Sequence, residues 1–132
     1  MADEFASRHG LECLIEPDLT EVGFGDWEGK TRQQLIALDQ QAFERFYQDP
    51  VRYPPAGAEP VGQLRQRVGA VFDRLISEHA DKQVLVVAHA GVMRAVISHV
   101  LDVPLQSIYR ITINNAARLR FELGSTIRLS MR

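Results

Sequence analysis

Hydrophobic and polar positions along this chain follow two different periods. Over residues 35–46 and 64–76, apolar side chains recur at helical spacing, which places them on one face of a helix. Thr31 precedes the first stretch and is a residue type that caps helix N-termini. Gly10 ends another helical stretch, as glycine commonly does. The expected helices cover residues 2–9, 31–47, 64–76 and 92–101.

Strand patterns fill most of the remaining chain. Residues 84–88 form a continuous apolar run bounded by polar residues, which predicts a strand buried on both faces of a helix-covered parallel sheet. Apolar residues alternate on either side of Gly124-Ser125, which predicts an antiparallel hairpin over residues 119–131. Strands interleaved with helices indicate one α/β layered domain. Further strands are expected over residues 11–15 and 108–113, and loops over residues 19–30 and 49–60.

Composition narrows the class of protein without indicating a function. The chain has 132 residues, a formal charge of −2, 45% hydrophobic residues and 24% charged residues, as in an ordinary globular domain. This charge gives no reason to expect a nucleic acid or an acidic membrane as a partner. No stretch approaches the roughly 20 apolar residues of a membrane-spanning helix. The acidic N-terminus lacks the features of a secretion signal, so we expect a cytoplasmic protein.

Cysteine and most of the histidines give no sign of redox or metal chemistry. Cys13 has no second cysteine for an internal disulfide, which fits a reducing compartment, and we expect it as a small apolar residue within a strand. No set of His, Cys and carboxylate residues has the spacing of a zinc site, so we expect no metal and no other cofactor. His79 and His99 lie on expected helices, where solvated or partly packed side chains are the ordinary interpretation.

The tripeptide His89-Ala90-Gly91 joins the expected strand at residues 84–88 to the next helix. Ligands of open α/β sheets bind at the carboxyl ends of strands, and a helix N-terminus there favours an anion such as phosphate. A histidine at this point can hold phosphate or transfer a proton. The alternative is that His89 only caps or packs against the helix. Arg94, one helical turn later, is expected to anchor the loop.

A second candidate site is the loop over residues 19–29, which carries two glutamates, a tryptophan and three glycines. Glu21 is suited to act as a general acid if a pocket raises its pKa. The alternative is a solvated loop in which Trp27 covers the core. Composition alone favours this second interpretation.

Three segments together resemble the histidine phosphatase superfamily, and in particular its phosphoglycerate-mutase-like and alpha-ribazole-phosphatase-like branch. Residues 21–29 (Glu-Val-Gly-Phe-Gly-Asp-Trp-Glu-Gly) are similar to a family segment with Glu, Phe-Gly and Trp-Glu-Gly at the same spacing. Residues 86–94 are similar to the strand and loop that carry the second catalytic histidine of the family. Residues 55–59 and the later Arg67 are similar to a Gly-Glu-Ser segment and its downstream arginine. The resemblance covers essentially all 132 residues.

This resemblance implies both a fold and a chemistry. The implied fold is a three-layer α/β sandwich, and the implied activity is hydrolysis of a small phosphomonoester, such as an alpha-ribazole phosphate or a sugar phosphate. A histidine attacks phosphorus in this family and no metal is needed, because fixed positive charge stabilises the transferring group. By the resemblance, His89 is the second histidine, Glu21 the proton donor and the Ala90 N–H a phosphate contact. The implied partner is a phosphorylated small molecule or inorganic phosphate.

The N-terminal tripeptide Arg8-His9-Gly10 spells the family's nucleophile motif in an unsuitable context. In the family the motif ends a buried strand, whereas here it follows a helical stretch, and its distance to Glu21 is too short. A helix end explains it, because cations favour the negative end of the helix dipole. We therefore expect an incomplete family domain that lacks its N-terminal strand and helix, with the nucleophile among the missing residues.

An incomplete sheet would expose an apolar strand edge, so we expect the chain to form a homo-oligomer that covers it. Two other functions stay open at this point. One is a truncated family member that acts as an anion-binding or structural protein without turnover. The other is an unrelated α/β small-molecule binder that shares only the strand-His-Gly feature.

Overall fold

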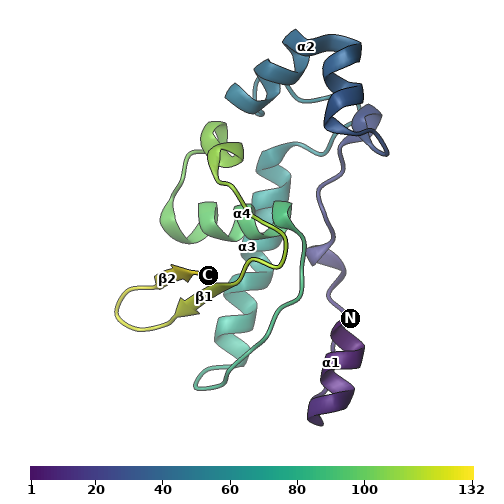
Figure 1. The fold of residues 1–132 in the computed structure, drawn as a ribbon. Coiled ribbons are helices and arrows are strands. Elements are labelled where there is room, and N and C mark those ends of the chain that lie inside the picture. Colours follow the sequence, from purple (N-terminus) through teal and green to yellow (C-terminus); the bar gives the residue numbers. More distant parts are fainter.

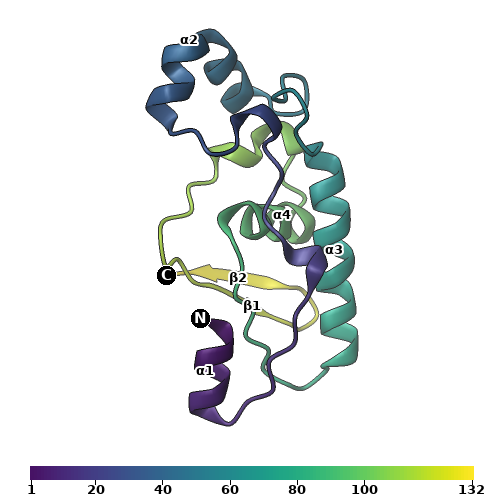
Figure 2. The same ribbon diagram turned by 90° about the vertical axis from the view of Figure 1, so that its right-hand side faces the viewer.

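A computed structural model describes all 132 residues and combines four α-helices with one small sheet (Figures 1 and 2). Helices α3 and α4 pack against each other at the centre, while α2 and α1 lie at opposite ends. The helices are α1 (Ala2–His9), α2 (Arg32–Gln48), α3 (Val61–Glu78) and α4 (Ala90–Leu101). The strands are β1 (Leu119–Glu122) and β2 (Arg128–Met131), and short 3-10 turns are η1 (Pro17–Leu19), η2 (Gly25–Trp27) and η3 (Leu105–Arg110).

All four predicted helices are present. Gly10 terminates α1 and Thr31 caps the start of α2, as expected. Gly10 has a φ of 63° and its N–H donates to the last turn of α1. Thr31 forms a capping box with Gln34, because its Oγ1 accepts from the Gln34 N–H at 3.2 Å and its own N–H donates to Gln34 Oε1 at 2.8 Å. Helix α2 is interrupted at Asp39, whose φ of −160° is not helical. Asp39 Oδ1 accepts from the Ala42 N–H at 2.9 Å and so restarts the helix beyond the interruption.

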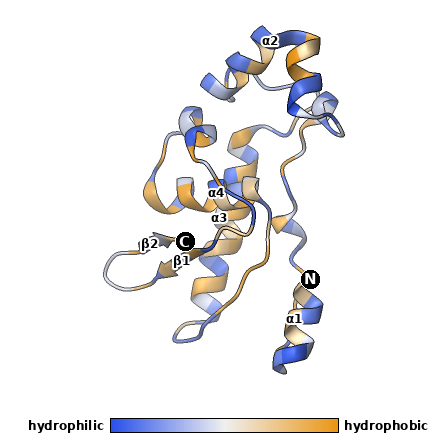
Figure 3. Cartoon of the chain, viewed as in Figure 1, coloured by the Kyte–Doolittle hydropathy of each residue, from blue (hydrophilic) through white to orange (hydrophobic).

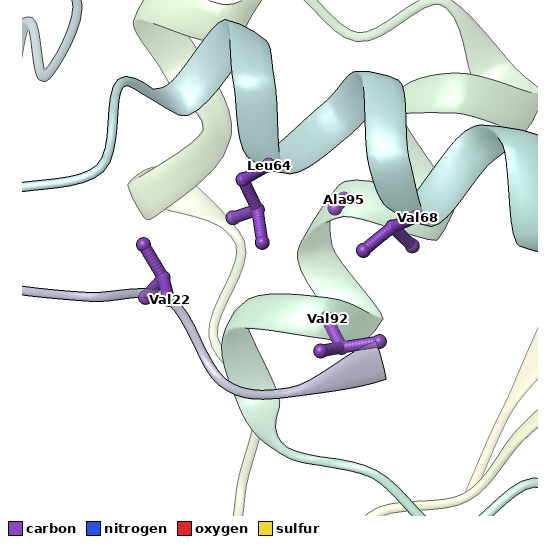
Figure 4. Packing of buried hydrophobic residues seen from close by; sticks show 5 residues of the cluster. All are labelled: Val22, Leu64, Val68, Val92 and Ala95. Carbon is purple, nitrogen blue, oxygen red and sulfur yellow. The ribbon is translucent and has the colours of Figure 1, made fainter. Parts of the chain in front are cut away.

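The main core lies between α3, α4 and the loop before η2 (Figure 4). Leu64 and Val68 of α3 face Val92 and Ala95 of α4, and Val22 closes the cluster from the loop. Each of these side chains is at most 6% exposed. The apolar face predicted for α3 therefore packs in the core. This packing also holds Val22, the residue next to Glu21.

The predicted hairpin is confirmed. Strands β1 and β2 pair antiparallel, with Phe121 opposite Leu129. The ring of Phe121 meets Phe72 of α3 edge to face, with ring centroids 5.3 Å apart. This aromatic contact joins the hairpin to the helical core.

Two other strand predictions are wrong for this chain, because the predicted strands have no neighbouring strands to pair with. Residues 11–15 and 84–88 are extended but belong to no sheet. The side chains of Val84, Leu85, Val86 and Val87 are 47–64% exposed, although their sequence predicted burial. Figure 3 shows this stretch as largely apolar coil leading into α4. An apolar run is buried only where other strands and helices cover it, and nothing in this chain does.

The remaining corrections are local. The predicted strand over residues 108–113 is wrong, because its first residues belong to the 3-10 helix η3. Ile108 lies in η3 and is buried, with 1% of its surface exposed. Cys13 is exposed rather than packed within a strand. None of the helices combines the length and the apolar character that crossing a membrane requires.

Candidate active site

His89 is the N-cap of α4, so a helix follows it as predicted, although the residues before it form no strand. Its backbone is extended, with φ −96° and ψ 167°, and its carbonyl oxygen accepts from the Met93 N–H at 3.0 Å. The imidazole is exposed and forms no hydrogen bond within the chain. The ring is therefore free to meet a ligand at the positive end of α4.

Glu21 reaches the same helix terminus from the loop before η2. Its Oε2 accepts from the Gly91 N–H at 3.2 Å, and its Oε1 accepts from the Val22 N–H at 2.8 Å. The Glu21 carboxylate thus contacts Gly91, which follows His89 by two residues, although Glu21 and His89 are far apart in the sequence. Glu21 and His89 therefore both lie at the N-terminus of α4, where the helix dipole favours an anion.

Gly91 lies where the Glu21 side chain meets the first turn of α4. A β-carbon at this position would lie 2.1 Å from Glu21 Oε1 and 3.1 Å from Val22 Cγ1. The missing side chain therefore makes room for the Glu21 carboxylate itself, and so it sets where the acid sits.

Arg67 of α3 and Glu59 form a partly buried ion pair beneath the Glu21 loop. Arg67 Nε donates to Glu59 Oε1 at 2.7 Å, and the two side chains are 22% and 20% exposed. Hydrogen bonding from Arg67 holds the pKa of Glu59 below its usual range. The sequence had associated both residues with a family segment but gave neither a role.

The second half of the glutamate loop is structural. Gly25 has a φ of 56°, and a β-carbon there would lie 2.1 Å from the Ala56 carbonyl oxygen, so only glycine fits. The Asp26 N–H donates to the same carbonyl at 2.9 Å. Trp27 stacks on Phe43 of α2, with ring centroids 5.9 Å apart. Trp27 therefore covers the core, as the alternative interpretation held, while Glu21 faces the site.

A cluster of aromatic side chains that the sequence did not indicate lies near Glu21. Tyr109 of η3 packs on Phe46, with ring centroids 4.7 Å apart, and the Arg94 guanidinium lies 5.3 Å above its ring. Burial raises the pKa of Tyr109 well above its usual range, while Arg94 opposes this shift. Arg94 Nε also donates to the Ile111 carbonyl at 2.8 Å, so Arg94 holds the segment after η3 and not the predicted loop at His89.

His9 has a structural position in the last turn of α1. Its Nδ1 is 2.9 Å from the Phe5 carbonyl oxygen, and its ring stacks on Phe5 with centroids 4.2 Å apart. The predicted helix-end context of Arg8-His9-Gly10 is therefore confirmed. No group of three or more His, Cys, Asp or Glu side chains converges as a metal site would require.

Comparison with known proteins shows the family of this chain. A model of the histidine phosphatase superfamily (branch 1) matches residues 1–126. The chain belongs to this superfamily. Among its curated relatives is the adenosylcobalamin/alpha-ribazole phosphatase of Escherichia coli, which is 27% identical over 108 residues. The match covers 82% of this chain and 53% of that protein. This histidine phosphatase chain thus spans about half the length of such relatives.

Solved structures show the same fold. YhfR from Bacillus stearothermophilus superposes with a TM-score of 0.82 at 27% identity, covering 98% of this chain and 67% of that one. A mycobacterial glucosyl-3-phosphoglycerate phosphatase, Rv2419c, solved with VO3, gives a TM-score of 0.80 at 24% identity, over 98% and 68% of the two chains. The histidine-phosphatase, phosphoglycerate-mutase-like fold is confirmed, even though only two strands pair within this chain.

Proposed function

We propose that this chain supplies the proton donor and a phosphate-holding histidine of a phosphomonoesterase that acts on a small metabolite. The observation that carries the proposal is the contact of the Glu21 carboxylate with the Gly91 N–H, beside His89. Free N–H groups and the dipole of a helix N-terminus attract an anion. A phosphoryl group bound there has the His89 ring and the Ala90 N–H as its nearest donors.

Hydrolysis of a phosphomonoester breaks the bond between phosphorus and the ester oxygen, while water, in the net reaction, forms the new bond to phosphorus. The leaving oxygen needs a proton. Glu21 is suited to give that proton because it lies at the same helix terminus as the proposed phosphate donors. Fixed donors then stabilise the charge that develops on the phosphoryl oxygens.

The relatives support a small phosphorylated metabolite as the substrate class. The Escherichia coli relative is an adenosylcobalamin/alpha-ribazole phosphatase by its name, and the mycobacterial one is a glucosyl-3-phosphoglycerate phosphatase. The mycobacterial enzyme also binds VO3, an oxyanion. An oxyanion site at the start of α4 agrees with both observations.

Binding of an anion without turnover is the second candidate function, and the position of His9 favours it. His9 is stacked on Phe5 and bonded to the α1 backbone rather than facing α4. Without a nucleophile, the His89 and Glu21 pair can hold phosphate but cannot transfer it.

Hydrolysis of an aryl phosphate and binding of inorganic phosphate, measured on the same preparations, test the proposal. The variants are His89→Ala, Glu21→Gln and His9→Ala, with His79→Ala at the end of α3 as the matched control. We expect His89→Ala to weaken phosphate binding, because it removes a donor, while His79→Ala and His9→Ala leave it unchanged. Turnover that depends on Glu21 and His89 supports the phosphatase function.

The outcomes separate the two candidates. Phosphate binding that needs His89, with no turnover by the 132-residue chain, supports anion binding alone. Equal phosphate affinity in His89→Ala and His79→Ala contradicts the proposed site. Loss of turnover in His9→Ala would show that the N-terminal tripeptide is catalytic after all.

A further inference from the structure

The guanidinium of Arg67 is fully engaged by the segment that carries Glu21. Arginine has five N–H donors in a rigid fork. Two of them meet the Glu59 carboxylate, at 2.7 Å from Nε and 2.9 Å from Nη2. The others meet backbone carbonyl oxygens of the loop, at 2.6 Å for Asp18, 2.9 Å for Thr20 and 3.5 Å for Glu21.

Glu59 holds the loop on the other side of Glu21, and we call the contacts of Arg67 and Glu59 with this loop the clamp. Its backbone N–H donates to the Gly23 carbonyl oxygen at 2.8 Å. Between these polar ties lies Val22, which is 6% exposed in the apolar core. The backbone of Glu21 is therefore held on both sides, and its carboxylate reaches the Gly91 N–H from a fixed position.

We infer that Arg67, oriented by Glu59, is the positioning residue that aims Glu21 at the start of α4. This inference rests on the proposed function, because Glu21 matters only if it acts on a ligand there. Lysine cannot replace arginine, since its ammonium is a point charge with three donors and no planar fork. Loss of the fork releases several carbonyl groups of the loop at once, while the apolar core stays packed.

Nuclear magnetic resonance of the whole chain tests this inference without any need for turnover. The Gly91 amide donates to Glu21, so its chemical shift follows the protonation of that carboxyl when the pH is varied. Glu21→Gln removes this dependence and identifies it. The test variant is Arg67→Lys, and the matched control is Arg65→Lys on the same helix, whose partner Asp102 is 91% exposed at 3.5 Å.

A positioning role predicts that Arg67→Lys loses most of the pH-dependent shift of Gly91, while the methyl signals of Val68 and Val92 stay in place. Arg65→Lys is expected to keep the shift. An unchanged Gly91 titration in Arg67→Lys overturns the inference, as does a wild-type Gly91 signal that Glu21→Gln does not alter. If Arg67→Lys fails to fold, Glu59→Gln takes its place, because it loosens the clamp and leaves the arginine.

Kinetics add a second measurement where the wild-type chain turns over an aryl phosphate. A misplaced acid slows the chemical step, so Arg67→Lys is expected to lower kcat by roughly a hundredfold. KM should change little, because His89 and Ala90 hold the phosphate. If Arg67→Lys lowers thermal stability and leaves kcat unchanged, Arg67 has only a structural role and the inference is wrong. An inactive wild-type chain would contradict the proposed hydrolysis, while the Gly91 titration would still decide the clamp.

Discussion

The imidazole of His99 on α4 lies directly against the backbone of Gly69 on α3. A β-carbon at Gly69 would come within 2.6 Å of Nδ1 and 2.9 Å of Cε1. The same ring reaches back to Asp73, with Nε2 2.8 Å from Oδ1. Gly69 is buried within the helix, so its absent side chain is what lets α3 and α4 pack with a histidine between them.

Gly69→Ala is therefore expected to destabilise the fold. Displacing the His99 ring costs about 1–3 kcal/mol by overpacking, which exceeds the gain of about 1 kcal/mol from alanine's helix propensity. Gly62→Ala on the same helix is the control, because its β-carbon would meet Leu105 at an ordinary 3.8 Å. Urea unfolding should show a loss for Gly69→Ala and a small gain for Gly62→Ala. Equal gains in both would contradict the packing argument.

Gly91→Ala is expected to act on Glu21 rather than on the fold. Its β-carbon would displace the Glu21 carboxylate, which is the flexible end of a side chain. Val22 Cγ1, at 3.1 Å, would need to shift by only a few tenths of an ångström, and the helix itself accepts alanine. Activity on an aryl phosphate should fall about as far as in Glu21→Gln. Adding Gly91→Ala to Glu21→Gln should cause little further loss, since residues that act as one unit are not additive. Additive losses in this double-mutant cycle would separate the two residues.

The Glu59 and Arg67 pair predicts a pH-dependent contribution to stability. The pKa of Glu59 is lowered in the folded state, chiefly by hydrogen bonds from Arg67, so the folded protein holds its proton less tightly than the unfolded chain. The stabilisation is present above the unfolded pKa of about 4.3 and is lost as the pH falls through the lower folded value. Glu59→Gln should cost about 1–3 kcal/mol near neutral pH, and this difference should shrink in acid.

Urea unfolding at several pH values measures that contribution. Glu78→Gln is the control, because Glu78 is 53% exposed and lies 3.5 Å from Arg74. Exposed pairs of this kind contribute about 0–1 kcal/mol. A Glu59→Gln deficit that stays constant from neutral to acid pH would rule out the charged pair as its cause.

Local features of this fold were readable from the sequence, while long-range ones were not. Thr31 caps α2 with a residue three positions away, and Gly10 ends α1 through its own backbone, so neighbouring residues determine both. Strand formation at residues 84–88 depends on partners elsewhere, and the apolar run could not reveal whether this chain provides them. The hydrophobic pattern therefore located an apolar segment but could not show that it forms no strand and stays exposed in this chain.

The candidate site divides in the same way. His89 was visible because its position between an apolar run and a helix is local. The link from Glu21 to Gly91 joins segments 70 residues apart, and the clamp by Arg67 spans 46–49 residues. No spacing rule gives such pairs, so a glutamate and an arginine were recognised through family resemblance, and the role of the arginine was missed.

The unpaired apolar segment at residues 84–88 leads to the last prediction, which is self-association. None of its backbone N–H or C=O groups takes part in a backbone hydrogen bond. An exposed apolar strand with free backbone groups is a template for pairing with another chain. We expect sedimentation velocity to detect dimers or larger species of this chain at micromolar concentration.

Val86→Lys should shift that equilibrium toward the monomer, because a charge on an edge strand opposes pairing. Val51→Lys is the matched control, since Val51 and Val86 are 46% and 47% exposed but only Val86 lies in the unpaired segment. If the loss of apolar surface alone weakened association, the two substitutions would act alike. A weaker dimer in Val86→Lys only would locate the contact at this edge. A wild-type chain that sediments as a monomer would mean that its exposed valines stay solvated.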